Sequence, residues 1–169
     1  MDWMSHHYMR KASAFLQKTG ITFSGTWIDC GCGYGYYSKA LSLLGADPVI
    51  AIDVKIRIFP EKTILVCRGE CGHLPVKNDS VSGFLYVNVL HYYRKPHSLL
   101  QEAHRALKDD GFLVTIEYDQ VAPTGWDPYP LSIQDMEPLL LTSSFRIVRK
   151  FLVDTEYRPK HVVVARKTI

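Results

Sequence analysis

The sequence lacks a large excess of charge and has no long apolar run. Lysine and arginine number 20 against 17 aspartate and glutamate residues, so the formal net charge is only +3. A nucleic-acid-binding arm or a membrane-surface helix needs a much stronger basic bias. No apolar run approaches the roughly 20 residues that cross a bilayer, and residues 1–20 contain no apolar core of a signal peptide. Hydrophobic residues make up 47% of the 169 positions, which predicts one domain around one buried core.

Cysteine is also scarce, and its spacing is informative. The four cysteines form two close pairs, Cys30 with Cys32 and Cys67 with Cys71, without the even spread of a secreted disulfide framework. We therefore expect a soluble protein of the reducing cytoplasm. Neither spacing is the usual C-x-x-C of a zinc knuckle, and we expect a strand to separate the two pairs. No metal site is predicted.

Apolar runs alternate with helical patterns along the chain, which predicts an α/β fold. Strands are expected at residues 26–30, 48–53, 63–67, 81–89, 111–117, 145–153 and 160–166. Helical or connecting segments separate the first five, so these strands should form a parallel sheet covered on both faces. Only residues 154–159 separate the last two strands, which is too short for a helical crossover and predicts an antiparallel hairpin.

Two helices and one loop have clear local signals. A helix should follow the glycine-rich stretch 31–35 and stop at Gly45. A second should start at Pro96, carry Leu107 on its apolar face and end before Gly111. Residues 120–132 contain three prolines and a glycine and are expected to form a loop.

The strongest chemical signal is the stretch TWIDCGCGYG at residues 26–35. Asp29 lies at a strand end, and Gly31, Gly33 and Gly35 precede a helix, so the backbone can turn tightly and approach a ligand. Asp53 ends the second apolar run, where an acidic residue accepts hydrogen bonds from ribose hydroxyls. A glycine loop followed by such an acid predicts a nucleoside site; a tight structural turn and a solvated strand end are the simpler alternative.

The spacing of the glycines indicates which nucleoside is bound. A dinucleotide fingerprint begun at Gly31 would need a glycine at position 36, where the chain has Tyr36. Asp29 precedes the first glycine, where a carboxylate would face a pyrophosphate unfavourably but would suit an amino-acid ammonium. The pattern therefore favours S-adenosylmethionine (SAM) over NAD, and a nicotinamide oxidoreductase is disfavoured.

At these residues the sequence resembles the class I SAM-dependent methyltransferases, in particular the small type-11 group, over about residues 26–117. Asp29 to Gly35 match the first family motif and Asp53 matches the ribose acid. The other matches are Gly69-Glu70-Cys71 with Leu74-Pro75, Asn88-Val89-Leu90-His91, and Arg105-Ala106-Leu107-Lys108 with Gly111.

The resemblance implies both the site and the fold. Asp29 and the three glycines would hold the methionine part of SAM, Asp53 the ribose, Glu70 and the Cys71 amide the adenine edge, and Asn88 would lie under the cofactor. Glu70 replaces the commoner aspartate of the family, and cysteines occupy two variable positions of the glycine loop. The implied fold is a doubly wound, mainly parallel seven-stranded sheet of order 3-2-1-4-5-7-6. Residues 1–169 would form a single domain, with 1–24 as a helical lid or packing segment.

Methyl transfer mainly requires alignment of donor and acceptor, and a base only where the acceptor must lose a proton. His91 is the first candidate base and Glu117 the second, because both lie near strand ends that should face the cofactor. A histidine that only bonds a neighbouring loop is an equally good interpretation. The aromatic residues of the loops after the fourth and fifth strands could line an acceptor pocket or merely cover the sheet; they are Tyr92, Tyr93, Tyr118, Trp126 and Tyr129.

We expect a small-molecule or protein acceptor. The D/N-P-P-Y motif of amino-directed nucleic-acid methylases is absent, which disfavours DNA, while RNA stays open because basic residues are scattered over 146–150 and 158–167. Selectivity should come from the N-terminal helix, the loop 120–132 and the turn 154–159. The alternative function is a non-catalytic SAM-binding sensor or partner subunit, which would need no open acceptor pocket.

One strand also suggests a partner. In the family's order, strand 63–67 is a sheet edge, and its run Ile64-Leu65-Val66 is apolar, so it could pair with a second copy or a small activator protein. The alternative is that residues 54–62 fold over this edge.

Overall fold

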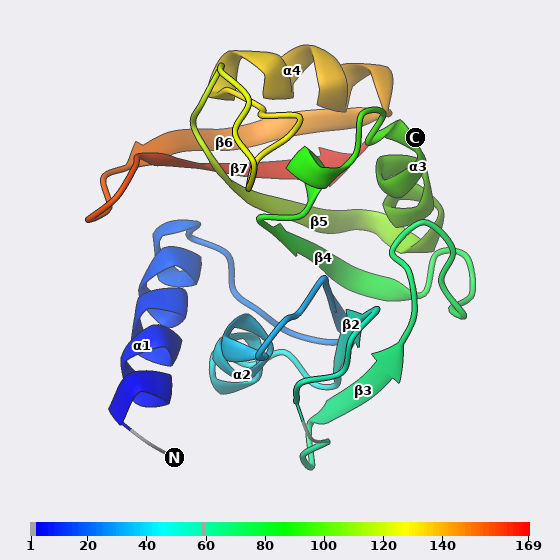
Figure 1. Ribbon diagram of the computed structural model, residues 1–169. Coiled ribbons are helices and arrows are strands. Elements are labelled where there is room, and N and C mark those ends of the chain that lie inside the picture. The colour runs from blue at the N-terminus through cyan, green and yellow to red at the C-terminus, as the bar shows by residue number, and fades with distance from the viewer. Residues whose placement is uncertain (1–2, 59) are drawn as a thin grey trace.

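The structure is a computed structural model that describes residues 3–58 and 60–169 (Figure 1). Its helices are α1 (Trp3–Lys18), α2 (Tyr36–Leu43), α3 (His97–Ala106) and α4 (Ile133–Thr142), with a 3₁₀ turn η1 (Leu90–Tyr92). Its strands are β1 (Trp27–Cys30), β2 (Val49–Asp53), β3 (Ile64–Arg68), β4 (Val81–Val87), β5 (Leu107–Tyr118), β6 (Phe145–Val153) and β7 (Lys160–Lys167).

The strands form one sheet in the order β3-β2-β1-β4-β5-β7-β6, which confirms the expected order. Strands β1 to β5 run parallel to one another, and β7 pairs antiparallel with both β5 and β6. The carboxyl ends of β1, β2 and β4 therefore meet at one edge of the sheet. This edge, where the strand order reverses direction, is where open α/β sheets bind ligands.

Helices cover both faces of the sheet. Figure 1 shows α1 and α2 on one side and α3 and α4 on the other. Each side has its own core: Ala12 of α1 and Leu41 of α2 pack with Trp27 of β1, while Leu100 of α3 and Leu140 of α4 belong to the opposite core. Because successive strand residues point to opposite faces, residue parity decides which side each strand residue serves.

Two boundaries near β4 and β5 differ from the sequence-based expectation. Helix α3 ends at Ala106, and Leu107 is the first residue of β5, where it pairs with Val81. The expectation that Leu107 lies on the helix that begins near Pro96 was therefore wrong. Strand β4 ends at Val87 because Asn88 has a left-handed φ of 54°, which cannot continue a strand. Residues 120–132 lie outside the helices and strands, as expected.

Helix α4 was not predicted, although its start carries a local signal. The Ser132 side chain accepts a hydrogen bond from the Asp135 amide, and the Asp135 side chain accepts one from the Ser132 amide. This capping box stabilises the first turn. Pro138 lies inside the helix. From the sequence alone, a proline at this position argues against a helix.

The N-terminal segment is helical over residues 3–18, and Met1 and Asp2 lie outside the described residues. In the described part of the chain, no helix combines the length and the apolar character needed to cross a membrane. The cytoplasmic location expected from the cysteines stays a prediction.

Candidate functional site

Asp29 is a buried carboxylate at the end of β1. Only 1% of the residue is exposed, and the Ser38 hydroxyl of α2 donates a 2.6 Å hydrogen bond to its Oδ2. The Asp29 pKa is raised to about 6, mainly by burial and in part by the nearby Asp53 charge, against the lowering effect of the Ser38 hydrogen bond. Asp29 is therefore a strained, that is a desolvated, anion, and a cation placed beside it would stabilise its ionised form.

The loop after Asp29 has the backbone shape that its glycines predict. Gly31, Gly33 and Gly35 have left-handed φ values of 76°, 54° and 75°. A β-carbon added at Gly31 or Gly35 would overlap Val89 or Ile58, whereas one added at Gly33 would meet no atom within 4 Å. Two of the glycines thus permit close packing inside the protein, and Gly33 faces open space.

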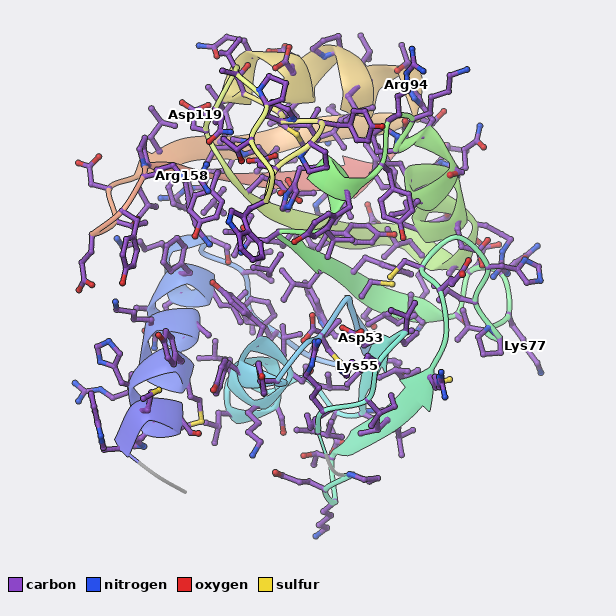
Figure 2. All side chains as sticks on the ribbon, viewed as in Figure 1. Asp53, Lys55, Lys77, Arg94, Asp119 and Arg158 are labelled. Atoms are coloured by element: carbon purple, nitrogen blue, oxygen red, sulfur yellow. The ribbon has the colours of Figure 1, made fainter. Side chains whose placement is uncertain are left out.

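Asp53 joins the end of β2 to this loop. Its Oδ2 accepts the Gly33 amide at 2.9 Å, and its Oδ1 accepts the Lys55 amide at 2.9 Å. Figure 2 shows Asp53 beside Lys55, on the β2 side of the end of β4. Two backbone amides thus fix the carboxylate, and each of its oxygens keeps a lone pair for a ligand hydroxyl.

The predicted adenine loop lies next to Asp53. The Gly69 amide donates to the Asp53 carbonyl at 3.1 Å, Glu70 is exposed, and Cys71 is buried. The rest of the loop is held from α3: Glu102 accepts the Leu74 amide at 2.7 Å, and Arg105 donates to the Val76 carbonyl at 2.9 Å. The motif residue Arg105 therefore supports the loop and does not itself face Asp53.

Strand β2 separates Cys30 of β1 from Cys67 of β3, as expected. Cys71 lies in the loop beyond β3 and shares a buried core with Cys30. Burial raises the Cys30 pKa well above its usual range and the Cys32 pKa to about 12. Both are neutral thiols at pH 7. Among the described residues, no three His, Cys, Asp or Glu side chains are placed to hold a metal ion; the absence of a metal stays a prediction.

Asn88 follows β4 and connects the site to β7. Its amide donates to the Ile116 carbonyl at 2.8 Å, and its Oδ1 accepts Lys160 Nζ at 3.3 Å. Asn88 also lines a cavity of about 740 Å³ that the other predicted site residues do not line. Asn88 is therefore the residue that the predicted cofactor site and this cavity have in common.

The cavity lies between α1, the start of α2 and the β6–β7 turn. Its aromatic lining residues are Tyr8, Phe15, Tyr36, Tyr37, Tyr118 and Tyr157, and its charged ones are Lys11, Lys18, Asp154, Glu156 and Lys160. The N-terminal helix and the turn 154–157 are thus both walls, whereas loop 120–132 is not among the lining segments. Of the predicted aromatic set, Tyr118 lines the cavity; Tyr92, Tyr93, Trp126 and Tyr129 are exposed elsewhere.

His91 and Glu117 form a buried pair. His91 Nδ1 donates to Glu117 Oε2 at 2.6 Å, and Glu117 Oε1 accepts the amides of Val89 and Leu90 at 2.9 and 2.8 Å. Loop 120–132 packs over this pair, since the Tyr129 amide donates to the His91 carbonyl at 3.0 Å. Glu117 points to the α3/α4 face, whereas Tyr118, the next residue, lines the cavity on the α1/α2 face.

Lys160 is the site residue that sequence reasoning missed. The hairpin's basic residues were interpreted as a mostly solvated face, but Lys160 lines the cavity with Nζ 4.4 Å from the Tyr118 ring centroid. No local motif marks it, because its position depends on the antiparallel pairing of Lys160 with Tyr118.

These residues fit the expected cofactor. Gly33 leaves open space beside the fixed carboxylate of Asp53, and Asp29 forms no ion pair with any described side chain. The ribose hydroxyls of such a ligand would fill the space beside Asp53, and its positive charge would compensate the charge of Asp29.

Comparisons with known proteins agree with this geometry. A family model described as a methyltransferase domain matches residues 28–115. The uncharacterized protein YafS of Escherichia coli (strain K12) is 27% identical over 95 residues, which cover 54% of this chain and 40% of that protein. The chain thus spans less than half of that relative's length.

Solved structures share the fold at low identity. The 1,6-didemethyltoxoflavin-N1-methyltransferase of Burkholderia thailandensis has a TM-score of 0.79 and 21% identity, covering 99% of this chain and 81% of that chain. A [4+2]-cyclase has a TM-score of 0.80 and 14% identity, covering 95% of this chain and 81% of that chain. Because proteins with such different reactions share it, the fold alone does not decide the chemistry.

The raised pKa of Asp29 generates a prediction about stability. Its folded-state pKa of about 6 exceeds the unfolded value of about 3.9, so folding favours the protonated acid and stability falls as pH rises between these values. At pH 8, Asp29→Asn should therefore raise the free energy of unfolding by roughly 1–3 kcal/mol in urea denaturation. At pH 4 the gain should vanish.

The exposed carboxylate Asp154 is the matched control, and Asp154→Asn should leave the urea midpoint unchanged at both pH values. An Asp29→Asn variant no more stable than wild type at pH 8 would show that Asp29 is not a strained anion.

Proposed function

The chain belongs to the family of methyltransferase domains, and from that membership we propose that it transfers a methyl group from SAM to a small-molecule or protein acceptor. The observation that carries this proposal is the 740 Å³ cavity that Asn88 lines together with Tyr36 and Tyr37, the two residues directly after the glycine loop. A sensor that only binds SAM needs no second space beside the cofactor. An enzyme needs one for its acceptor.

The predicted residues have distinct roles in this proposal. Asp29, Gly31, Gly33 and Gly35 hold the methionine part, and Asp53 holds the ribose hydroxyls. Glu70 and the Cys71 amide face the adenine, and Asn88 lies beneath the cofactor at the cavity mouth. When bound, SAM supplies an electrophilic methyl group on a positively charged sulfur.

The protein's contribution to the reaction is then alignment and charge. The walls of the cavity hold the acceptor in line with the methyl group, and alignment of this kind can supply about 7–11 kcal/mol. Asp29 and Asp53 stabilise the positive charge of the bound cofactor. That charge in turn favours the ionised form of Asp29.

The first test is cofactor binding by isothermal titration calorimetry. SAM and its demethylated product S-adenosylhomocysteine (SAH) should bind, and NAD should not, because Tyr36 replaces the third glycine of a dinucleotide loop. Asp53→Ala should weaken SAM binding by about 1–3 kcal/mol through the loss of charge-assisted hydrogen bonds. Tight NAD binding without SAM binding would contradict the assignment, and an acceptor screen with labelled SAM would follow a positive result.

We propose His91, oriented by Glu117, as the general base only for an acceptor that must lose a proton and that reaches the α3/α4 face, because His91 does not line the 740 Å³ cavity. The short hydrogen bond between them fixes the ring and stabilises the imidazolium that a base becomes. The same pair supports the loop after β4, since Glu117 also accepts two of its amides.

His91→Asn separates these two roles. If His91 removes a proton, kcat should fall about 100-fold or more while SAH affinity is kept. Loss of thermal stability with kcat unchanged would instead assign the pair to support of the loop.

The edge strand β3 supports a separate proposal about partners. Leu65 is 52% exposed in the middle of β3, and Ile58 packs against Gly35, so the described part of segment 54–62 does not bury Leu65. We propose that this edge pairs with a second copy or a small activator protein.

Leu65→Lys should abolish this association in light scattering of the purified protein or in a pull-down, because a charge on an exposed strand opposes strand addition. SAM affinity should not change, since Leu65 is on the opposite edge of β2 from the glycine loop. A protein that is monomeric in cell extract and fully active alone would exclude the partner.

A further inference from the structure

The argument for a ligand class begins at the first residue of β7. Lys160 pairs with Tyr118 of β5 and with Val153 of β6, and the three residues line the same cavity. Its Nζ lies 3.3 Å from Asn88 Oδ1 and 4.4 Å from the centre of the Tyr118 ring. The ammonium is thus held at the junction between the predicted cofactor site and the cavity.

This ammonium has no counterion within the described protein. No described carboxylate lies within 4.0 Å of Lys160 Nζ, and its close polar contact is the neutral amide oxygen of Asn88. The Lys160 pKa is lowered to about 8, mainly by burial and in part by Arg158, against the raising effect of Glu117 from the other face of β5. A partly desolvated cation of this kind is costly unless an anion accompanies it.

The other cations near the cavity differ from Lys160. Lys11 of α1 pairs with Glu156 at 3.3 Å, and both are exposed. Lys18 is exposed to water. Arg158 stacks over the Tyr118 ring at 4.1 Å and lies 4.0 Å from Asp127, and Figure 2 shows it on the β7 side of the site, away from Asp53. Lys160 is therefore the cation most in need of an anionic ligand.

The walls around Lys160 suit a flat molecule. Tyr8 of α1 and Tyr36 of α2 stack on each other at 5.3 Å, and the rings of Phe15 and Tyr37 also line the cavity. The Tyr118 ring is already in contact with Arg158 and Lys160. Aromatic walls favour offset or edge contacts with planar rings. A cavity of about 740 Å³ is within the range of small-molecule sites.

We propose that the cavity binds a planar aromatic acceptor that carries a carboxylate, and that the carboxylate pairs with Lys160. This inference rests on the proposed function, because it names the acceptor class of that same site. Lys160 is a positioning residue here: the ion pair sets the orientation of the ring relative to the cofactor side of Asn88.

A carboxylate can reach Lys160 from two sources, the acceptor and the methionine part of the cofactor. Either carboxylate would neutralise the Lys160 ammonium. The two sources differ in whether the affinity for the acceptor or the affinity for the cofactor depends on Lys160. If the acceptor supplies the anion, Lys160 variants keep SAH affinity and lose the preference for anionic aromatic ligands. If the cofactor supplies it, SAH affinity falls.

The experiment uses the full chain saturated with SAH, titrated with 2-naphthoate and with the neutral 2-naphthamide. The wild-type complex should bind naphthoate about tenfold or more tightly than naphthamide, as one charge-assisted contact provides. Lys160→Met should bring this ratio close to one and leave SAH affinity within about twofold. Lys160→Arg should keep the preference for naphthoate.

Lys11→Met is the matched control, because Lys11 lines the same cavity but already has Glu156 as its partner; its ratio should remain that of wild type. An unchanged ratio in Lys160→Met, or a loss of SAH affinity in that variant, would overturn the inference. Absence of SAH binding to wild type would instead reject the proposed function, so the two failures are distinguishable.

Discussion

The alternation of side chains along the strands decides which groups of this protein can act together. Asp29, Asp53, Tyr118 and Lys160 all point to the face covered by α1 and α2, as their strand neighbours in that core show. Glu117 points to the other face, where it holds His91 and the loop after β4. The predicted cofactor acids and the cavity cation therefore lie on one face of the sheet, whereas the imidazole–carboxylate pair lies on the other face.

The charges of this face are separated along the sheet edge. Asp29 and Asp53 place negative charge at the ends of β1 and β2, and Lys160 places positive charge at the start of β7, with Asn88 between them. Each charge is unfavourable in the protein alone, because Asp29 and Lys160 are desolvated without ion-pair partners among the described residues. Groups of this kind lower stability and favour ligands of opposite charge.

The β6–β7 hairpin has a functional as well as a structural position. It closes the sheet antiparallel, and its turn at 154–157 faces α1 across the cavity. Helix α1 also packs on α2, which begins directly after the glycine loop. Helix α1 and the turn at 154–157 therefore enclose one space near the predicted cofactor residues. Acceptor selectivity in so small a fold can therefore arise from segments far apart in sequence.

The sequence by itself determined the strand order, through the resemblance of Asp29 to Gly35 and of the later motifs, and the short segment 154–159 predicted the hairpin. It also predicted Asp29, the three glycines and Asp53 as cofactor residues, since strand ends and glycine spacing are local properties; this assignment stays a prediction. It missed α4, where Pro138 obscured a helix that the Ser132 and Asp135 cap supports. Only the tertiary structure brought Lys160 to Asn88 and Tyr118, and Cys71 to Cys30, because these contacts join residues that no local pattern relates. The cavity and its charge depend on such non-local packing, and for this reason the proposed ligand class rests on the fold and not on the motifs.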